Sequence, residues 1–181
     1  MSRVPLVDPA TDGPANDLLA AVRSTLGIVP NMTRAMANSP AVLKAHLAFG
    51  EALGGGRVDK HTGELIALTV AETNGCDYCL AAHTAIGGML KIGADDLVAA
   101  RGAAHRDPRT RAILAFARKV VVARGHVHDA DVAALRIAGL DDAEIADVVG
   151  HIAINVFTNL FNSAMRTDID FPVAAPLKRA A

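Results

Sequence analysis

The chain has 181 residues, 51% of them hydrophobic, which suits one compact domain with a sizeable core. The formal net charge of −1 argues against a broad attraction to nucleic acid or to an anionic membrane. No run reaches the roughly 18 apolar residues of a membrane span. Residues 1–5 carry no apolar signal segment, so we expect a cytoplasmic protein with no membrane or nucleic-acid partner.

The composition favours an all-α fold of closely packed helices. Aromatic residues make up only 3% of the chain, alanine is abundant, and no segment gives a convincing strand pattern. We divide the chain into an N-terminal arm over residues 1–14, a compact multi-helical domain over 15–165 and a tail over 166–181. Apolar spacing, together with glycine and proline punctuation, predicts helices over residues 16–25, 32–38, 41–53, 58–73, 76–91, 95–101, 109–124, 129–138 and 141–165.

The fourth and fifth predicted helices carry the most informative motif. The only two cysteines, Cys76 and Cys79, follow a break at Asn74 and Gly75, either of which can cap a new helix. His83 comes four residues after Cys79, so all three chemical side chains share one helix face. The positive end of a helix favours the thiolate, which is the reactive form of cysteine.

Glu64 lies in the preceding helix. If the two helices form a hairpin, Glu64 is about 16 Å before the turn and His83 about 12 Å after it, so the two side chains can meet. A carboxylate on one imidazole nitrogen fixes the tautomer and strengthens the other nitrogen as a base. Glu64, His83 and Cys79 then form a carboxylate–base–nucleophile chain.

Two plainer interpretations of the cysteine pair remain open. The pair could supply half of a zinc site, although the sequence has no second cysteine pair, and His83 with one distant histidine fits poorly. The cysteines could also be inert core residues, because a free cysteine packs like a small hydrophobe. We predict no metal and no cofactor. In a cytosolic protein a Cys-x-x-Cys pair indicates redox chemistry, although the βαβ context of thioredoxin is missing.

The spacing Glu64-x11-Cys76-x2-Cys79-x3-His83 resembles the motif of alkylhydroperoxidase D-like (AhpD-like) proteins in the carboxymuconolactone decarboxylase superfamily. The stretch Val-Pro-Asn-Met at residues 29–32 is similar to the N-terminal part of its peroxidase-related members. The resemblance implies an AhpD-like helical domain and a peroxidase with an antioxidant role. It also implies a homo-oligomer, a trimer or a hexamer, that takes electrons from a dithiol protein or a lipoyl-type donor.

The resemblance also implies roles for the four residues of the motif. Cys79 is the peroxidatic thiol, Cys76 is the resolving thiol and proton donor, and Glu64 and His83 form the proton relay. Tyr78 departs from the family pattern, which often has a histidine just before the second cysteine. A phenol replaces an imidazole poorly near neutral pH, and on a helix Tyr78 points away from the face of Cys79.

Other polar residues have weaker functional interpretations. His126 and His128 lie in a predicted loop and are expected at the surface. His151 and Asn155 stand one turn apart on an otherwise apolar helix, so each needs a partner, in the thiol pocket or at a subunit contact. The functional alternatives to a peroxidase are a thiol–disulfide oxidoreductase without peroxide activity and a non-catalytic helical assembly protein.

Overall fold

The structure is a computed structural model that describes residues 1–177, in which nine α-helices and no strand are present. The predicted all-α fold is confirmed, and each predicted helix exists with its ends shifted by a few residues at most. The helices are α1 (Asn16–Leu26), α2 (Asn31–Met36), α3 (Pro40–Gly54), α4 (Lys60–Asn74), α5 (Asp77–Met89), α6 (Ala94–Arg101), α7 (Pro108–Val122), α8 (Asp129–Ile137) and α9 (Asp142–Met165).

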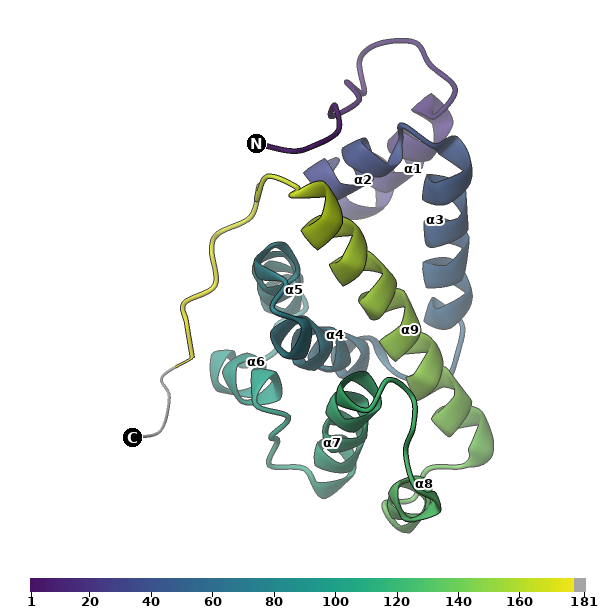
Figure 1. Cartoon of the computed structure of the whole chain (residues 1–181), viewed down its shortest axis with the longest axis vertical. Coiled ribbons are helices and arrows are strands. Elements are labelled where there is room, and N and C mark those ends of the chain that lie inside the picture. The colour runs from purple at the N-terminus through teal and green to yellow at the C-terminus, as the bar shows by residue number, and fades with distance from the viewer. Residues whose placement is uncertain (178–181) are drawn as a thin grey trace.

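Helix α4 forms the centre of the molecule, with α5, α6, α7 and α9 packed around it (Figure 1). Its middle, from residue 65 to residue 71, is buried without interruption, as expected for a helix covered on several sides. Helices α1, α2 and α3 form a second, smaller cluster with the end of α9 (Figure 1). The long helix α9 therefore connects the two clusters and passes beside both helices of the predicted hairpin.

The junction between α4 and α5 differs from the prediction in one respect. We expected Asn74 or Gly75 to cap the second helix, but Cys76 itself is the N-cap, and its sulfur accepts a hydrogen bond from the backbone N–H of Cys79 at 3.3 Å. Gly75 instead closes α4, with a φ of 66° that suits glycine. Helix α5 thus begins one residue later than predicted because Cys76 occupies the capping position.

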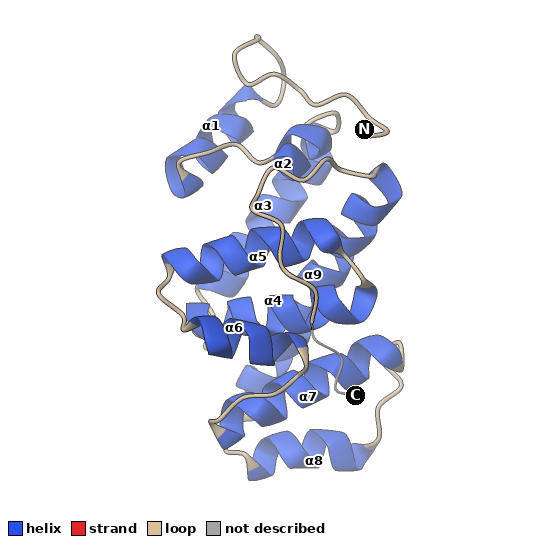
Figure 2. Cartoon of the chain, turned by 90° about the vertical axis from the view of Figure 1, so that its left-hand side faces the viewer, coloured by secondary structure: helices blue, strands red, loops and turns tan. Residues whose placement is uncertain are grey.

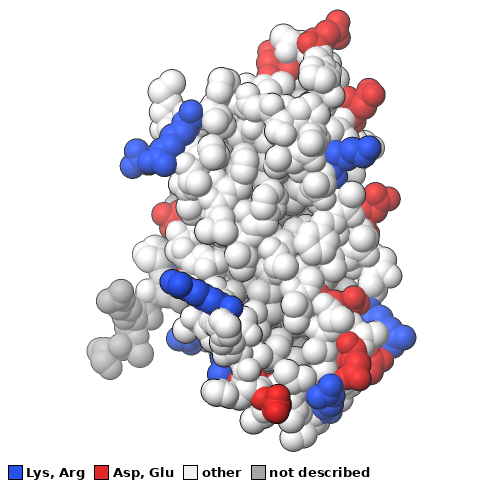
Figure 3. Space-filling model, turned by 45° about the vertical axis from the view of Figure 1, so that its right-hand side comes forward, with Lys and Arg blue, Asp and Glu red and all other residues white. Residues whose placement is uncertain are grey.

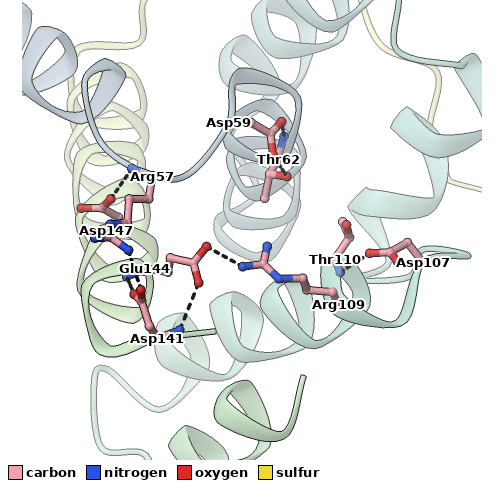
Figure 4. Close-up of polar contacts among 9 residues, drawn as sticks. All are labelled: Arg57, Asp59, Thr62, Asp107, Arg109, Thr110, Asp141, Glu144 and Asp147. Atoms are coloured by element: carbon pink, nitrogen blue, oxygen red, sulfur yellow. Dashed lines mark hydrogen bonds and ion pairs between the residues drawn. The ribbon is translucent and has the colours of Figure 1, made fainter. Parts of the chain in front are cut away.

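Polar side chains cap the N-terminal ends of α4, α7 and α9 (Figure 4). Asp141 and Glu144 form a reciprocal capping box at the start of α9. Arg109 of α7 donates to Glu144 at 2.6 Å, and the backbone N–H of Arg57, ahead of α4, donates to Asp147 at 2.6 Å. These contacts set the position of α9 relative to α4, and thus where α9 passes the cysteine motif.

The segment before α1 and the described part of the tail both contact the helices. The predicted N-terminal arm pairs with the end of α9, where the N–H of Arg3 donates to the carbonyl of Met165 at 2.7 Å. The tail crosses α5 (Figure 2), and its carbonyl at Ala175 accepts a hydrogen bond from buried Arg101 at 2.6 Å. The end of the predicted tail, residues 178–181, lies outside the described residues.

Candidate active site

The two cysteines stand at the N-terminus of α5 and are joined by a disulfide bond, with their Cα atoms 5.3 Å apart. Each residue is only 2% exposed. The predicted proximity of the sulfurs is therefore observed, and the pair can pass between dithiol and disulfide. Burial this deep favours a small reagent over a bulky one at the sulfurs.

Glu64 of α4 and His83 of α5 meet across the hairpin. The Oε2 atom of Glu64 lies 2.8 Å from Nδ1 of His83, and the side chains are 19% and 21% exposed. The predicted hairpin contact between them is thus confirmed. A carboxylate on Nδ1 leaves Nε2 as the nitrogen available for proton transfer. His83 follows Cys79 by one helical turn on the same face of α5.

Two further histidines lie near this pair. His46 of α3 is close enough to His83 for the two charges to interact, and burial, followed by this interaction, lowers the pKa of His46. His151 of α9 packs on Gly63 of α4, where an added Cβ would lie 3.2 Å from its Cε1 atom. Burial also lowers the pKa of His151, although nearby carboxylates, including Glu64, act in the opposite direction. The His151 ring thus lies beside the Glu64–His83 pair, on the side of α4 next to Glu64.

Asn155 finds its hydrogen-bond partner within α9. Its Nδ2 donates to the carbonyl of His151 at 2.8 Å, a bond within α9, and the residue is 6% exposed. The partner that the sequence required is therefore supplied by its own helix.

Asn162 of α9 is a site residue that the sequence analysis missed. Its Nδ2 lies 3.4 Å from Sγ of Cys79 and 3.2 Å from Sδ of Met32, and the residue is 3% exposed. Three asparagines on the buried face of α9, Asn155, Asn159 and Asn162, follow the i, i+4, i+7 spacing. Three amide side chains on the same face of an otherwise apolar helix are the sequence signal that could have revealed Asn162.

As predicted, the side chain of Tyr78 points away from the face of α5 that carries Cys79. Its hydroxyl accepts a hydrogen bond from the N–H of Met32 at 3.1 Å, and its ring packs edge-on against Phe171 of the tail. Burial raises the pKa of Tyr78, and nearby Asp170 adds to this effect. Tyr78 therefore joins α5 to α2 and to the tail, and is buried as a neutral phenol.

The two loop histidines lie away from the cysteine pair. His126 and His128 are exposed, as expected, in and after the loop that precedes α8.

Within residues 1–177, no three histidine, cysteine or acidic side chains gather as metal ligands would. A hollow of about 510 Å³ between α6 and the tail is lined by Val98 and Leu177 among others, but not by either cysteine. In the same range, no helix combines the length and apolarity that a bilayer crossing requires.

Comparison with known proteins agrees with this geometry. Residues 40–119, which include the whole motif, match the carboxymuconolactone decarboxylase family. A peroxidase-related protein from Silicibacter sp. is 29% identical, with a TM-score of 0.81 over 92% of this chain and 91% of that one. The chain therefore has the fold of alkylhydroperoxidase D-like proteins and contains a segment similar to the carboxymuconolactone decarboxylase family.

Two further structures show how widely this AhpD-like fold is used. A peroxidase-related protein from Ralstonia eutropha, described as an alkylhydroperoxidase AhpD core, is 29% identical with a TM-score of 0.82, covering 93% of this chain and 92% of that one. A debrominase in complex with 2,3,4-tribromopyrrole shares the fold at 21% identity and a TM-score of 0.78, covering 94% of each chain. The search among curated proteins gave no match.

Proposed function

We propose that this protein is a thiol-dependent peroxidase that reduces hydroperoxides through Cys76 and Cys79. The observation that carries the proposal is the Glu64–His83 contact. His83 follows Cys79 by one helical turn, and Cys79 is close enough to Cys76 to form a disulfide. An imidazole held by a carboxylate beside a helix-terminal thiol is the arrangement that proton-coupled sulfur chemistry requires. The 29% identical peroxidase-related proteins support the same reaction class.

The oxidative half-reaction begins on the reduced pair. His83, oriented by Glu64, accepts the proton of the Cys79 thiol, directly or through a water molecule or Cys76. The thiolate then attacks one peroxide oxygen, and as the S–O bond forms the O–O bond breaks. Cys79 becomes a sulfenic acid, and the departing oxygen takes a proton from the relay to leave as an alcohol or water.

The reductive half-reaction restores the thiols. Cys76 attacks the sulfur of the sulfenic acid, so that the S–S bond forms and one water molecule leaves. A dithiol protein or a lipoyl-type donor then supplies two electrons and two protons, and is itself oxidised to a disulfide. Recycling of this kind needs a supply of reducing thiols, so we propose a cytoplasmic location.

Turnover of peroxide by three proteins tests the proposal. Wild type with a dithiol donor is expected to consume peroxide continuously, whereas Cys79→Ser should fall to the uncatalysed rate. Cys76→Ser should consume about one equivalent and leave a sulfenic acid that a dimedone-type reagent traps. Full turnover by Cys79→Ser would remove Cys79 as the nucleophile.

The same assay separates the alternatives. Turnover of lipoyl or other disulfides without peroxide consumption would indicate a thiol–disulfide oxidoreductase. Two thiols that never form the Cys76–Cys79 disulfide under mild oxidation would indicate a non-catalytic assembly protein. The burial of both sulfurs supports the small peroxide as substrate over a large disulfide.

We further propose that the protein is a homo-oligomer, a trimer or a hexamer, that buries the outer face of α3 and α9. Figure 3 shows this side as a broad area without charged side chains. Phe49 on α3 and Phe157 and Leu160 on α9 are 41%, 39% and 65% exposed there. Apolar patches of this kind mark interaction sites. His46, a neighbour of His83, packs against Phe157, so such an interface would border the relay.

A further inference from the structure

The environment of the two sulfurs differs in one respect that bears on which cysteine reacts. The sulfur of Cys76 accepts the backbone N–H of Cys79, a contact inside the motif. The sulfur of Cys79 lies 3.4 Å from the side-chain amide of Asn162, which is contributed by α9. Asn162 is 83 residues away in the chain, so this contact exists only in the folded protein.

The orientation of the Asn162 amide follows from its neighbours. The two atoms that face it are the sulfurs of Met32 and Cys79, at 3.2 and 3.4 Å, and a thioether or disulfide sulfur can only accept. The NH₂ group must therefore point at the sulfurs, because the opposite orientation would set a carbonyl oxygen against two acceptors. The Oδ1 atom is then buried, without a partner among residues 1–177.

We propose that Asn162 is a further catalytic residue, which donates from Nδ2 to the thiolate of Cys79 and then accepts, at Oδ1, the hydrogen of the Cys79 sulfenic acid. A hydrogen bond to an ionised sulfur is stronger than one to a neutral thiol, so the donor favours the thiolate. A buried, unpartnered carbonyl oxygen is costly until a donor arrives, and the S–O–H group formed by peroxide attack is such a donor. The inference rests on the proposed function only for this second step.

The contact also bears on the choice of nucleophile. The helix terminus and a backbone N–H act on Cys76, as they do on the first cysteine of thioredoxin-like motifs. Cys79 precedes His83 by one helical turn and has the amide of Asn162 3.4 Å from its sulfur, whereas the sulfur of Cys76 accepts the backbone N–H of Cys79. Asn162 thus supplies a physical reason for the attack to begin at Cys79.

The test measures the ionisation of Cys79 without peroxide. In a Cys76→Ser background Cys79 is the only thiol, so the pH dependence of its alkylation by iodoacetamide reports its thiolate directly. Replacing Asn162 with Leu should move the alkylation midpoint upward by about one pH unit, which is about tenfold less thiolate below the midpoint. Asn162→Asp, which places an acceptor at the same point, should move it further.

Asn159 provides a matched control. It is an asparagine of the same helix, 1% exposed, whose Oδ1 accepts from Asn74 and which, among residues 1–177, makes no hydrogen bond to the sulfur of either cysteine. Asn159→Leu should leave the alkylation midpoint within about 0.3 pH units of the parent. Equal midpoints for the parent, Asn162→Leu and Asn162→Asp would overturn the proposal, as would equal shifts for the Asn159 and Asn162 variants.

A second measurement needs no Asn162 variant and so avoids a failure to fold. In ¹⁵N-labelled Cys76→Ser protein, the side-chain NH₂ resonance of Asn162 should titrate with the same midpoint as alkylation of Cys79. A resonance that does not move while Cys79 ionises would also overturn the proposal. Shifted midpoints in a protein that consumes no peroxide would refute the proposed peroxidase and leave the thiolate contact intact. Peroxide turnover with unshifted midpoints would refute the role of Asn162 and leave the proposed peroxidase intact.

Discussion

Glu64 and His83, 19 residues apart in the chain, are held 2.8 Å apart by the packing of α4 against α5. Each residue is about one-fifth exposed, so the pair is partly shielded from water and still open to proton exchange. The contact links a carboxylate to the helix face that carries both cysteines.

Removal of the carboxylate should slow the peroxide reaction without preventing the disulfide. Glu64→Gln keeps the shape of the side chain but no longer fixes the His83 tautomer, so we expect the second-order rate with peroxide to fall roughly tenfold to a hundredfold. Stopped-flow measurement of the Cys79 oxidation rate checks this result. Glu51→Gln, an exposed change on α3, is the control. A Glu64→Gln protein as fast as wild type would show that the contact is only structural.

The two relay residues should also behave as a unit. Once His83 is replaced by Gln, the loss of Glu64 has no imidazole left to act through. The Glu64→Gln/His83→Gln double variant should therefore react within about twofold of His83→Gln alone. A double variant whose rate loss equals the product of the two single-variant losses would contradict the relay.

The partly buried histidines His46 and His151 should make the fold less stable in mild acid. Burial holds the pKa values of His46 and His151 below their usual 6.5. As the pH falls below about 6.5, the unfolded chain therefore binds protons before the native protein does, and the free energy of unfolding decreases until the lowered native pKa values are passed. Carboxylates near His151 oppose this effect, but burial outweighs them.

Thermal unfolding midpoints measured from pH 7.5 down to pH 5 check that sign. His151→Gln should flatten the decline, because glutamine does not titrate, while His126→Gln in the exposed loop should leave it unchanged. A midpoint that rises in acid, or a slope that His151→Gln does not alter, would contradict the assignment.

Tyr78 should contribute to stability and not to catalysis. Tyr78→Phe leaves the N–H of Met32 without its 3.1 Å acceptor, so we expect a loss of about 1–2 kcal/mol in the free energy of unfolding by urea. The peroxide rate should stay within about twofold of wild type, and Tyr78→His should not increase it. A large loss of activity at unchanged stability would place the phenol in the reaction.

The apolar face of α3 and α9 should set the oligomeric state. Leu160→Glu places a charge on this face and should shift the protein to monomers in sedimentation velocity, since burying an unpaired carboxylate is costly. Ile137→Glu, on α8, is the matched control because that residue is 88% exposed and lies away from the face. Wild-type protein that sediments as a monomer would refute the proposal, and so would unchanged assembly of Leu160→Glu.

The sequence by itself determined the helices and the motif. Periodic apolar residues, glycine stops and aspartate caps are local signals, so the nine helices could be predicted to within a few residues. The pairing of Cys76 with Cys79, and their place on one face with His83, followed from spacing along one helix. The Glu64–His83 contact was also within reach, since a hairpin of two adjacent helices leaves few arrangements.

Only the tertiary structure decided what lies opposite those residues. The path of α9, set by contacts such as Arg109–Glu144 at its far end, brings the Asn162 amide to Cys79 and the His151 ring to Gly63. The same packing turns Tyr78 toward Met32. The cap at Cys76, where Asn74 or Gly75 had been expected, is by contrast a local contact with the N–H of Cys79. Contacts between residues 46 to 88 positions apart depend on how helices pack, and local periodicity carries no information about that.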